Sequence, residues 1–193
     1  MSTDASEPPG SKVFVNVYDI AVNNNQQLAR FGVGIHHTGI EVYGIEYAYG
    51  GHAFDDTGVY EMSPRNEEEV CGEVIFNVSL FVGKTDLSES QARTRIYQIA
   101  EQFSGNTYHL LTRNCNHFTQ EVCQELTGEI LPSWVNRLAK VSSYIPFVNS
   151  FLPASWLYPW RDEKDEQSQT SSPVSFSASY KRMPIPSEKS YIV

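Results

Sequence analysis

The sequence predicts an α+β fold in which a small, mostly antiparallel sheet packs against helices. Two observations lead to this prediction. Short runs of β-branched and aromatic residues, separated by Gly, Asn, Asp or Pro, fill the first half of the chain, and helical patterns follow in the second half. The connections between these runs are short, which favours antiparallel pairing, because parallel strands need a long crossover. With 40% hydrophobic residues among 193, the chain has enough apolar side chains for a core.

Five segments have the composition of strands. Each combines Val, Ile, Phe or Tyr with turn-forming residues at its ends. The predicted strands are 13–18, 33–43, 46–49, 59–62 and 74–81.

The first predicted helix begins at Asp86 or Ser88, where Gln91 completes a capping box with Ser88, and it runs to about Ser104. Gly105 is well placed to end it. The apolar stripe of this helix consists of Leu87, Ile96, Ile99, Ala100 and Phe103.

A second predicted helix runs from near Asn114 to near Leu126, and Gly128 follows it. A third begins after Pro132, a residue that suits the first turn of a helix. The aromatic segment 144–160 is expected to wrap around the core.

Composition divides the chain into three parts. Residues 1–12 are polar and predict a flexible N-terminus, whereas 13–160 contain most of the apolar residues and form the predicted domain. Residues 161–193 are rich in charged residues, Ser and Pro. They predict a disordered tail, because so few aliphatic side chains cannot offset the entropy of ordering.

Charge and cysteine content exclude several protein classes. The chain has 14 basic and 23 acidic residues, a net charge of −9, which argues against nucleic acid as a partner. No apolar run approaches the roughly 18 residues of a membrane span, and the N-terminal segment has no apolar stretch of a secretion signal. Three cysteines cannot form a disulfide framework. We therefore expect a cytoplasmic or nuclear protein.

Cys115 is the strongest candidate for a catalytic residue. Asn114 before it is a good N-cap residue, so Cys115 falls in the first turn of the second predicted helix. The spacing of positions 115, 118, 122 and 126 puts it on the apolar stripe, which faces the rest of the protein. The helix dipole and unpaired main-chain N–H groups there favour a thiolate and suit an oxyanion. A buried structural cysteine is the alternative, and this is how we interpret Cys71 and Cys123.

A catalytic cysteine needs a base, which is usually histidine. His36 and His37 are adjacent in a predicted strand, so they point to opposite faces, and only one of them can face the helix that carries Cys115. Both faces contain apolar residues, so alternation leaves the choice open. His117 lies two residues from Cys115 and does not face it on a helix. His52 lies in a loop that can line a cleft, and His109 precedes two leucines and suits packing.

Other chemistries have little support in the sequence. The spacing of His109, Cys115, His117 and Cys123 matches no zinc pattern, so we predict no metal. The chain contains no G-x-S-x-G motif and no phosphate-binding glycine pattern, and we predict no cofactor.

Five ordered blocks resemble the PPPDE family of permuted-papain-fold cysteine peptidases, also called the desumoylating isopeptidase (DeSI) family, and within it the DeSI-2 type. The blocks cover most of the predicted domain. They are Val15-Asn16-Val17-Tyr18-Asp19, Gly32-Val33-Gly34-Ile35-His36-His37-Thr38-Gly39-Ile40-Glu41-Val42-Tyr43-Gly44, Glu46-Tyr47-Ala48-Tyr49-Gly50-Gly51-His52, Arg113-Asn114-Cys115-Asn116-His117-Phe118 and Ile130-Leu131-Pro132-Ser133-Trp134-Val135-Asn136-Arg137-Leu138.

This resemblance implies a permuted papain-like fold and a catalytic dyad. The family histidine precedes a Thr or Ser on an early strand, which corresponds to His37 here, and the family cysteine in an Asn-Cys-Asn motif corresponds to Cys115. Main-chain N–H groups at the helix start, assisted by the side chain of Asn114, are expected to hold the oxyanion. The implied substrates are conjugates of ubiquitin or SUMO, cleaved at the isopeptide bond.

Glycines near these residues suggest a narrow groove for the thin Gly-Gly tail of such modifiers. We expect Gly34, Gly39, Gly51 and His52 to shape it.

Two other functions remain open on the sequence. The first is a protein S-depalmitoylase that uses the same dyad on thioesters, and the second is a binding module without catalysis. The aromatic residues of 144–160 suit a homodimer contact. The last residues, Tyr191-Ile192-Val193, fit the pattern of a C-terminal ligand for PDZ domains.

Overall fold

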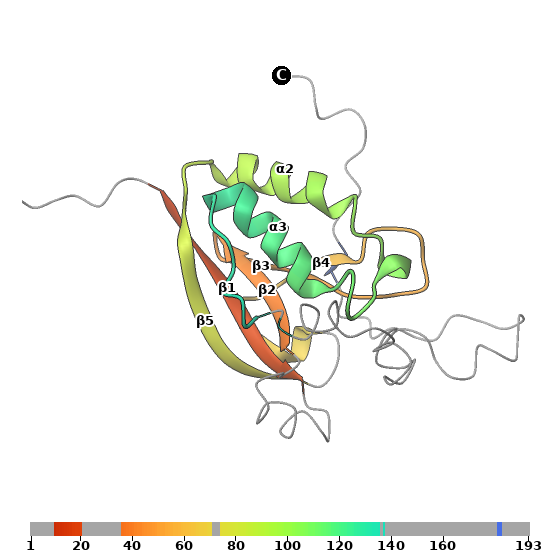
Figure 1. Ribbon diagram of the computed structural model, residues 1–193. Helices are drawn as coiled ribbons and strands as arrows, with labels where there is room; N and C mark the ends of the chain where they lie inside the picture. The colour runs from red at the N-terminus through yellow and green to blue at the C-terminus, as the bar shows by residue number, and fades with distance from the viewer. Residues whose placement is uncertain (1–9, 21–35, 71–73, 136, 138–180, 183–193) are drawn as a thin grey trace, which may run out of the picture.

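The computed structural model describes residues 10–20, 36–70, 74–135, 137 and 181–182. One antiparallel sheet in the order β5-β1-β2-β3-β4-β6 is packed against two α-helices (Figure 1). The strands are β1 (Ser11–Ile20), β2 (His36–Val42), β3 (Ile45–Tyr49), β4 (Val59–Met62), β5 (Val74–Thr85) and β6 (Lys181–Arg182). The helices are α2 (Glu89–Ala100) and α3 (Cys115–Thr127), with short 3₁₀ turns η1 (Glu67–Glu69) and η2 (Gly105–Thr107). The predicted α+β class is therefore confirmed.

The five predicted strands are all present, with some changes in length. β4 has the predicted bounds, whereas β1 and β5 extend beyond the prediction because they pair with each other over almost their whole lengths. β2 is described from His36 onward, and residues 33–35 of that predicted strand lie outside the described residues. Tyr43 and Gly44, both with positive φ, form the tight turn between β2 and β3.

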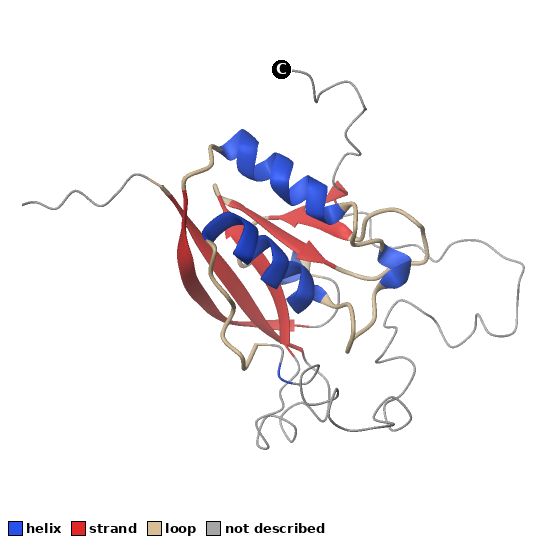
Figure 2. Cartoon of the chain, turned by 45° about the horizontal axis from the view of Figure 1, so that its top comes forward, coloured by secondary structure: helices blue, strands red, loops and turns tan. Residues whose placement is uncertain are grey.

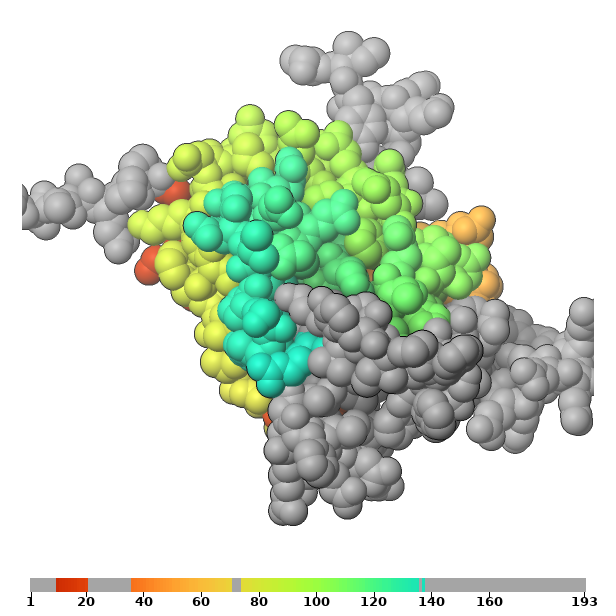
Figure 3. Space-filling model, viewed as in Figure 1, coloured from red at the N-terminus to blue at the C-terminus, as the bar shows by residue number. Residues whose placement is uncertain are grey.

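Alternation along the strands separates two buried faces of the sheet. Val13, Val15 and Val17 of β1 point toward α2 and α3 and belong to the main apolar core. Tyr18 belongs to a smaller apolar cluster with residues of β3 and β4. The helices lie together on one face of the sheet (Figure 2), and in the space-filling view their side chains cover the middle of that face (Figure 3).

Helix α2 begins as the sequence predicts but ends earlier. Ser88 is the N-cap and forms the expected capping box with Gln91. The helix ends at Ala100 rather than near Ser104, and Gly105 opens the turn η2 instead of terminating the helix. A Cβ atom at Gly105 would lie 2.3 Å from Cε1 of His52, so this glycine allows the loop after β3 to pack closely.

Helix α3 follows the prediction closely. Asn114 is its N-cap, and Gly128 is its C-cap in the left-handed conformation, with φ 76°. Its buried residues include the predicted stripe of Cys115, Phe118, Val122 and Leu126. This stripe places the start of the helix against β2.

Parts of the predicted organisation lie outside the described residues. The third predicted helix is described only to residue 135 and at 137, where main-chain hydrogen bonds form turns. Residues 181–182, within the segment predicted to be disordered, pair with Tyr60 and Glu61 of β4. Residues 1–9, 138–180 and 183–193 lie outside the described residues, and so does the aromatic segment 144–160 that was expected to wrap around the core.

Candidate active site

Cys115 is the first residue of α3, and its position is fixed by the cap before it. Oδ1 of Asn114 accepts a hydrogen bond from the main-chain N–H of His117 at 3.1 Å, and the N–H of Asn114 donates to Nδ1 of His117 at 3.2 Å. Nδ2 of Asn114 donates to the main-chain oxygen of Leu110 at 2.6 Å. The contacts of the Asn114 side chain therefore hold the helix start, which is a structural role distinct from the expected help to the oxyanion.

A buried polar network fastens the start of α3 to β2. Oγ1 of Thr38 donates to Oδ1 of Asn116 at 2.9 Å and contacts Oγ1 of Thr119 at 3.0 Å. Nδ2 of Asn116 donates to the main-chain oxygen of His36 at 3.3 Å. Because Thr38, Asn116 and Thr119 are all buried, these hydrogen bonds specify one position of the helix on the strand.

The thiol of Cys115 lies against a stretch of β2 that β3 does not cover. β3 pairs with β2 only from Gly39 to Val42, so residues 36–38 have no β3 partner. Sγ of Cys115 lies 3.9 Å from the main-chain oxygen of His36. The thiol thus sits beside the main chain next to residue 37.

Burial raises the pKa of the Cys115 thiol, although main-chain N–H groups of Thr38 and Asn116 and the hydroxyl of Tyr108 oppose this effect. Oη of Tyr108 lies 3.9 Å from Sγ, and only 2% of Cys115 is exposed. The N–H groups at the helix start thus favour the thiolate, as expected, but desolvation outweighs them and the pKa of the thiol is raised.

His37 lies on the opposite side of β2 from the helix. Its cross-strand neighbour on β1 is Tyr18, and the two ring centroids are 6.0 Å apart. The imidazole is buried, which lowers the pKa of His37 to about 4 and keeps the ring neutral at physiological pH. Its Nε2 has no hydrogen-bond partner in the part of the chain that the structure describes. The structure therefore brings residue 37 next to Cys115 along the strand, with no hydrogen bond from Nε2 to the thiol.

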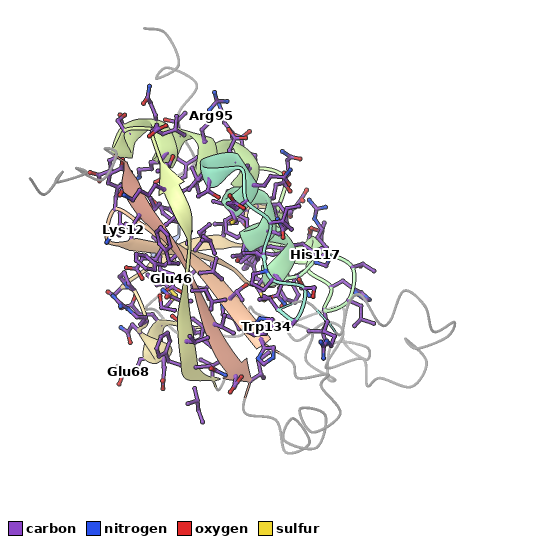
Figure 4. All side chains as sticks on the ribbon, turned by 60° about the vertical axis from the view of Figure 1, so that its left-hand side comes forward. Lys12, Glu46, Glu68, Arg95, His117 and Trp134 are labelled. Atoms are coloured by element: carbon purple, nitrogen blue, oxygen red, sulfur yellow. The ribbon has the colours of Figure 1, made fainter. Side chains whose placement is uncertain are left out.

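Of the two adjacent histidines, the predicted dyad residue His37 was expected to face the helix that carries Cys115. The structure places His36 on that face instead, because Thr38, which bonds to α3, alternates with His37 along β2. On this side of β2, Nδ1 of His36 contacts Oδ1 of Asp19 at 2.8 Å. Its ring stands edge-to-face with Trp134, with centroids 5.6 Å apart. Figure 4 shows Trp134 and His117 on the helix side and Glu46 on the other side of the sheet. His36 and His37 therefore lie on opposite faces of β2, beside the stretch of strand that contacts the start of α3.

The expected groove residues have other contacts. A Cβ at Gly39 would lie 2.1 Å from Oε1 of Glu46, so this glycine leaves space for a buried carboxyl group. The ring of His52 contacts Thr57 and Phe54 through its nitrogens, at 3.2 Å each, within its own loop. Gly51 is buried, and Gly34 lies outside the described residues.

Sequence reasoning missed the polar residues that surround the thiol. Tyr108, Thr38 and Asn116 were not predicted to have a role, and each contacts Cys115 or fixes its helix. Asn116 directly follows Cys115, and a polar residue on the buried side of a helix start is a usable signal. Tyr108 had no comparable signal, because its contact depends on how the loop before α3 folds back.

Two further observations concern the described residues only. No group of three or more His, Cys, Asp or Glu side chains there is arranged to hold a metal ion. None of the described helices combines the length and apolar character needed to cross a bilayer. Cys123 is buried within α3, where burial raises the pKa of its thiol.

Comparison with known proteins places these features in context. Residues 11–156 match the PPPDE putative peptidase domain. The chain is 47% identical over 147 residues to "Desumoylating isopeptidase 1 homolog" of Caenorhabditis elegans, covering 76% of this chain and 44% of that protein. It is 47% identical over 143 residues to a "DeSI-like protein" of Arabidopsis thaliana, covering 74% of this chain and 60% of the relative.

A third relative is covered more fully. "DeSI-like protein sdu1" of Schizosaccharomyces pombe is 35% identical over 144 residues, which are 73% of this chain and 70% of that protein. By contrast, the chain spans only 44% and 60% of the lengths of the worm and plant proteins.

Proposed function

Since this chain belongs to the PPPDE putative peptidase family, we propose that it is a cysteine isopeptidase that removes ubiquitin or SUMO from protein conjugates. Cys115 is the proposed nucleophile and His37 the proposed general base. The observation that carries the proposal is the position of the thiol. It lies at the start of a capped helix and beside the main chain of β2 next to residue 37. The names of the relatives, which include "Desumoylating isopeptidase 1 homolog", support the substrate class.

The proposed reaction requires that the site first rearrange so that the His37 imidazole reaches the thiol, because the two side chains share no hydrogen bond in this structure. The thiol proton is then transferred from Cys115 to His37. Sγ then attacks the isopeptide carbonyl, and main-chain N–H groups at the start of α3 stabilise the oxyanion. The C–N bond breaks as His37 gives its proton to the leaving lysine amine. Water next attacks the thioester as His37 takes a proton from it, and the C–S bond breaks to release the modifier, whose carboxylic acid loses its proton to solvent. His37 then returns its proton to Sγ of Cys115, which restores the neutral thiol and imidazole.

The shifted pKa values of Cys115 and His37 favour a mechanism in which His37 acts as a general base, rather than one that starts from a thiolate–imidazolium ion pair. Burial keeps both the Cys115 thiol and the His37 imidazole neutral, because it raises the pKa of the first and lowers that of the second. A neutral imidazole can accept a proton. We therefore propose that the thiolate forms only when a substrate reaches the site.

Access to the thiol requires rearrangement of its surroundings. Only 2% of Cys115 and 6% of His37 are exposed. Side chains around Sγ must therefore move before a carbonyl carbon can approach, and hydrogen bonds between catalytic groups often become shorter only in the complex with substrate. A bound modifier tail is proposed to induce this change.

The test is incubation of the full chain with ubiquitin and SUMO probes that carry a C-terminal electrophile, followed by mapping of the modified residue. We expect a covalent adduct at Cys115 with at least one probe and none in Cys115→Ala. Hydrolysis of an S-acyl thioester without reaction with either probe would identify a depalmitoylase instead. Absence of both reactions would support a binding module.

The identity of the base is tested with a matched pair of variants. His37→Ala is expected to abolish cleavage of a fluorogenic SUMO or ubiquitin amide, whereas His36→Ala keeps activity, because the His36 side chain is paired with Asp19. If activity is lost only in His36→Ala, then His36 is the base instead of His37.

A further inference from the structure

A buried carboxyl group lies in the sheet on the same side as His37. Glu46 of β3 is fully buried, and its oxygens accept hydrogen bonds from three donor groups. Oη of Tyr18 lies 2.9 and 3.0 Å from the two oxygens, Nδ2 of Asn16 lies 2.6 Å from Oε2, and the main-chain N–H of Arg65 lies 2.9 Å from it.

Burying a carboxyl group costs free energy even when it is well hydrogen-bonded, and an apolar side chain would fill such a position without that cost. The fold also makes space for Glu46, since a Cβ at Gly39 would overlap it. The proposed chemistry does not use Glu46 directly. Its role must therefore be sought in the groups that it holds.

The group that connects Glu46 to the site is Tyr18. Its ring is fully buried and contacts the rings of His37 and Phe76, with centroid distances of 6.0 and 5.6 Å. The hydrogen bonds to Glu46 fix the hydroxyl end of this ring. The position of the ring beside the imidazole is thereby fixed as well.

Packing against Tyr18 contributes to the orientation of the His37 imidazole. Catalytic histidines are commonly oriented by a hydrogen bond from a carboxylate or amide, but among the described residues Nε2 of His37 is buried without a partner. The neighbouring aromatic ring then limits how the imidazole can rotate.

We propose that Tyr18, anchored by Glu46, is a positioning residue for the His37 base. This inference rests on the proposed function, because it assigns the network to the orientation of the proposed base. Loss of the anchor should leave the substrate-binding surface intact and disturb the alignment of the base, so it should lower kcat rather than raise KM.

The test variant is Tyr18→Phe, which keeps the ring and removes the hydroxyl. We expect kcat for the fluorogenic amide to decrease about tenfold or more with little change in KM. In two-dimensional NMR spectra, the Cε1–H signal of the His37 imidazole is expected to shift, although the ring that packs against it is retained. Glu46→Gln, which keeps the size of the side chain, is the second variant and should produce the same changes.

Tyr97→Phe is the matched control. Oη of Tyr97 also donates to a carboxylate, that of Glu61 at 2.9 Å, in a network that includes Arg93 and lies between α2 and β4. This variant should lose stability without loss of kcat and without a shift of the His37 signal.

The outcomes separate the two proposals. If Cys115→Ala and His37→Ala abolish activity while folded Tyr18→Phe keeps both the wild-type kcat and the His37 signal, the positioning role is overturned alone. If His37→Ala retains full activity, the proposed base is wrong. The Tyr18 network then has no catalytic imidazole to position.

Discussion

At the scale of single residues, burial decides the protonation of the candidate dyad. Cys115 and His37 would be a thiolate and an imidazolium in many cysteine peptidases, but both are shielded from water here. Desolvation acts on each group in the direction of its neutral form. Because the thiolate is the reactive species, we expect slow reaction of Cys115 with small oxidants.

The lowered pKa of His37 predicts a dependence of stability on pH. The unfolded chain binds a proton at His37 near its ordinary pKa of 6.5, whereas the folded chain does so only near 4. The contribution of the neutral His37 to the free energy of unfolding is therefore fully present above about pH 6.5. It is lost as the pH falls toward 4, by about 3 kcal/mol in total. Denaturant unfolding of wild type and His37→Gln from pH 4 to pH 7.5 measures this contribution, and we expect a flatter curve for the variant. Parallel curves would contradict the burial of the ring.

At the scale of secondary-structure elements, the cap of α3 and its contact with β2 determine where the thiol lies. Asn114 closes the start of the helix, and Asn116 attaches it to the strand through Thr38. Because these hydrogen bonds join buried polar side chains, they hold α3 in one position on β2. The same burial makes that position sensitive to a single substitution.

Asn114→Ala is expected to reduce the free energy of unfolding by about 1 kcal/mol and to lower the rate of probe labelling at Cys115. Asn114→Ser restores an oxygen that can accept from the N–H of His117, so it should recover most of both losses. Thermal unfolding and timed labelling measure the two effects. Equal behaviour of the Ala and Ser variants would show that the cap has no part in placing the thiol.

Gly39→Ala tests whether this glycine belongs to the sheet or to a substrate groove. The added Cβ would meet the carboxyl group of Glu46 at 2.1 Å, so we expect a loss of about 1–3 kcal/mol in stability from overpacking. Denaturant unfolding gives the loss. If the variant instead keeps its stability and has a raised KM, Gly39 lines the substrate groove, as the sequence suggested.

At the scale of the whole molecule, the sequence predicted correctly those features that depend on residues close together in the chain. The strands, the capping box at Ser88, and Asn114 and Gly128 at the ends of α3 follow from residue types and spacing. The early end of α2 was not predictable in this way, because Gly105 serves contact with His52 from a distant loop. The surroundings of Cys115 and His37 were also missed, since burial depends on how separate segments pack.

The predicted domain boundary at residue 160 leads to a test on the complete chain. Truncation after 160 removes β6, which contributes two residue pairs at the edge of the sheet. We expect a loss of about 1 kcal/mol and an unchanged rate of probe labelling at Cys115. Calorimetry and labelling of the truncated chain check this. A failure to fold would extend the domain into the segment 161–193.

The hydrogen bond between Thr38 and Asn116 joins positions 78 residues apart in the chain. An N-terminal fragment with the strands would lack Cys115 and a C-terminal fragment with the helices would lack His37, so neither could carry the proposed chemistry by itself. During synthesis Cys115 emerges long after His36 and His37, and the proposed chemistry must wait until α3 docks on β2. Cleavage of the chain between these positions would leave two inert pieces whose reunion could be followed by the return of labelling.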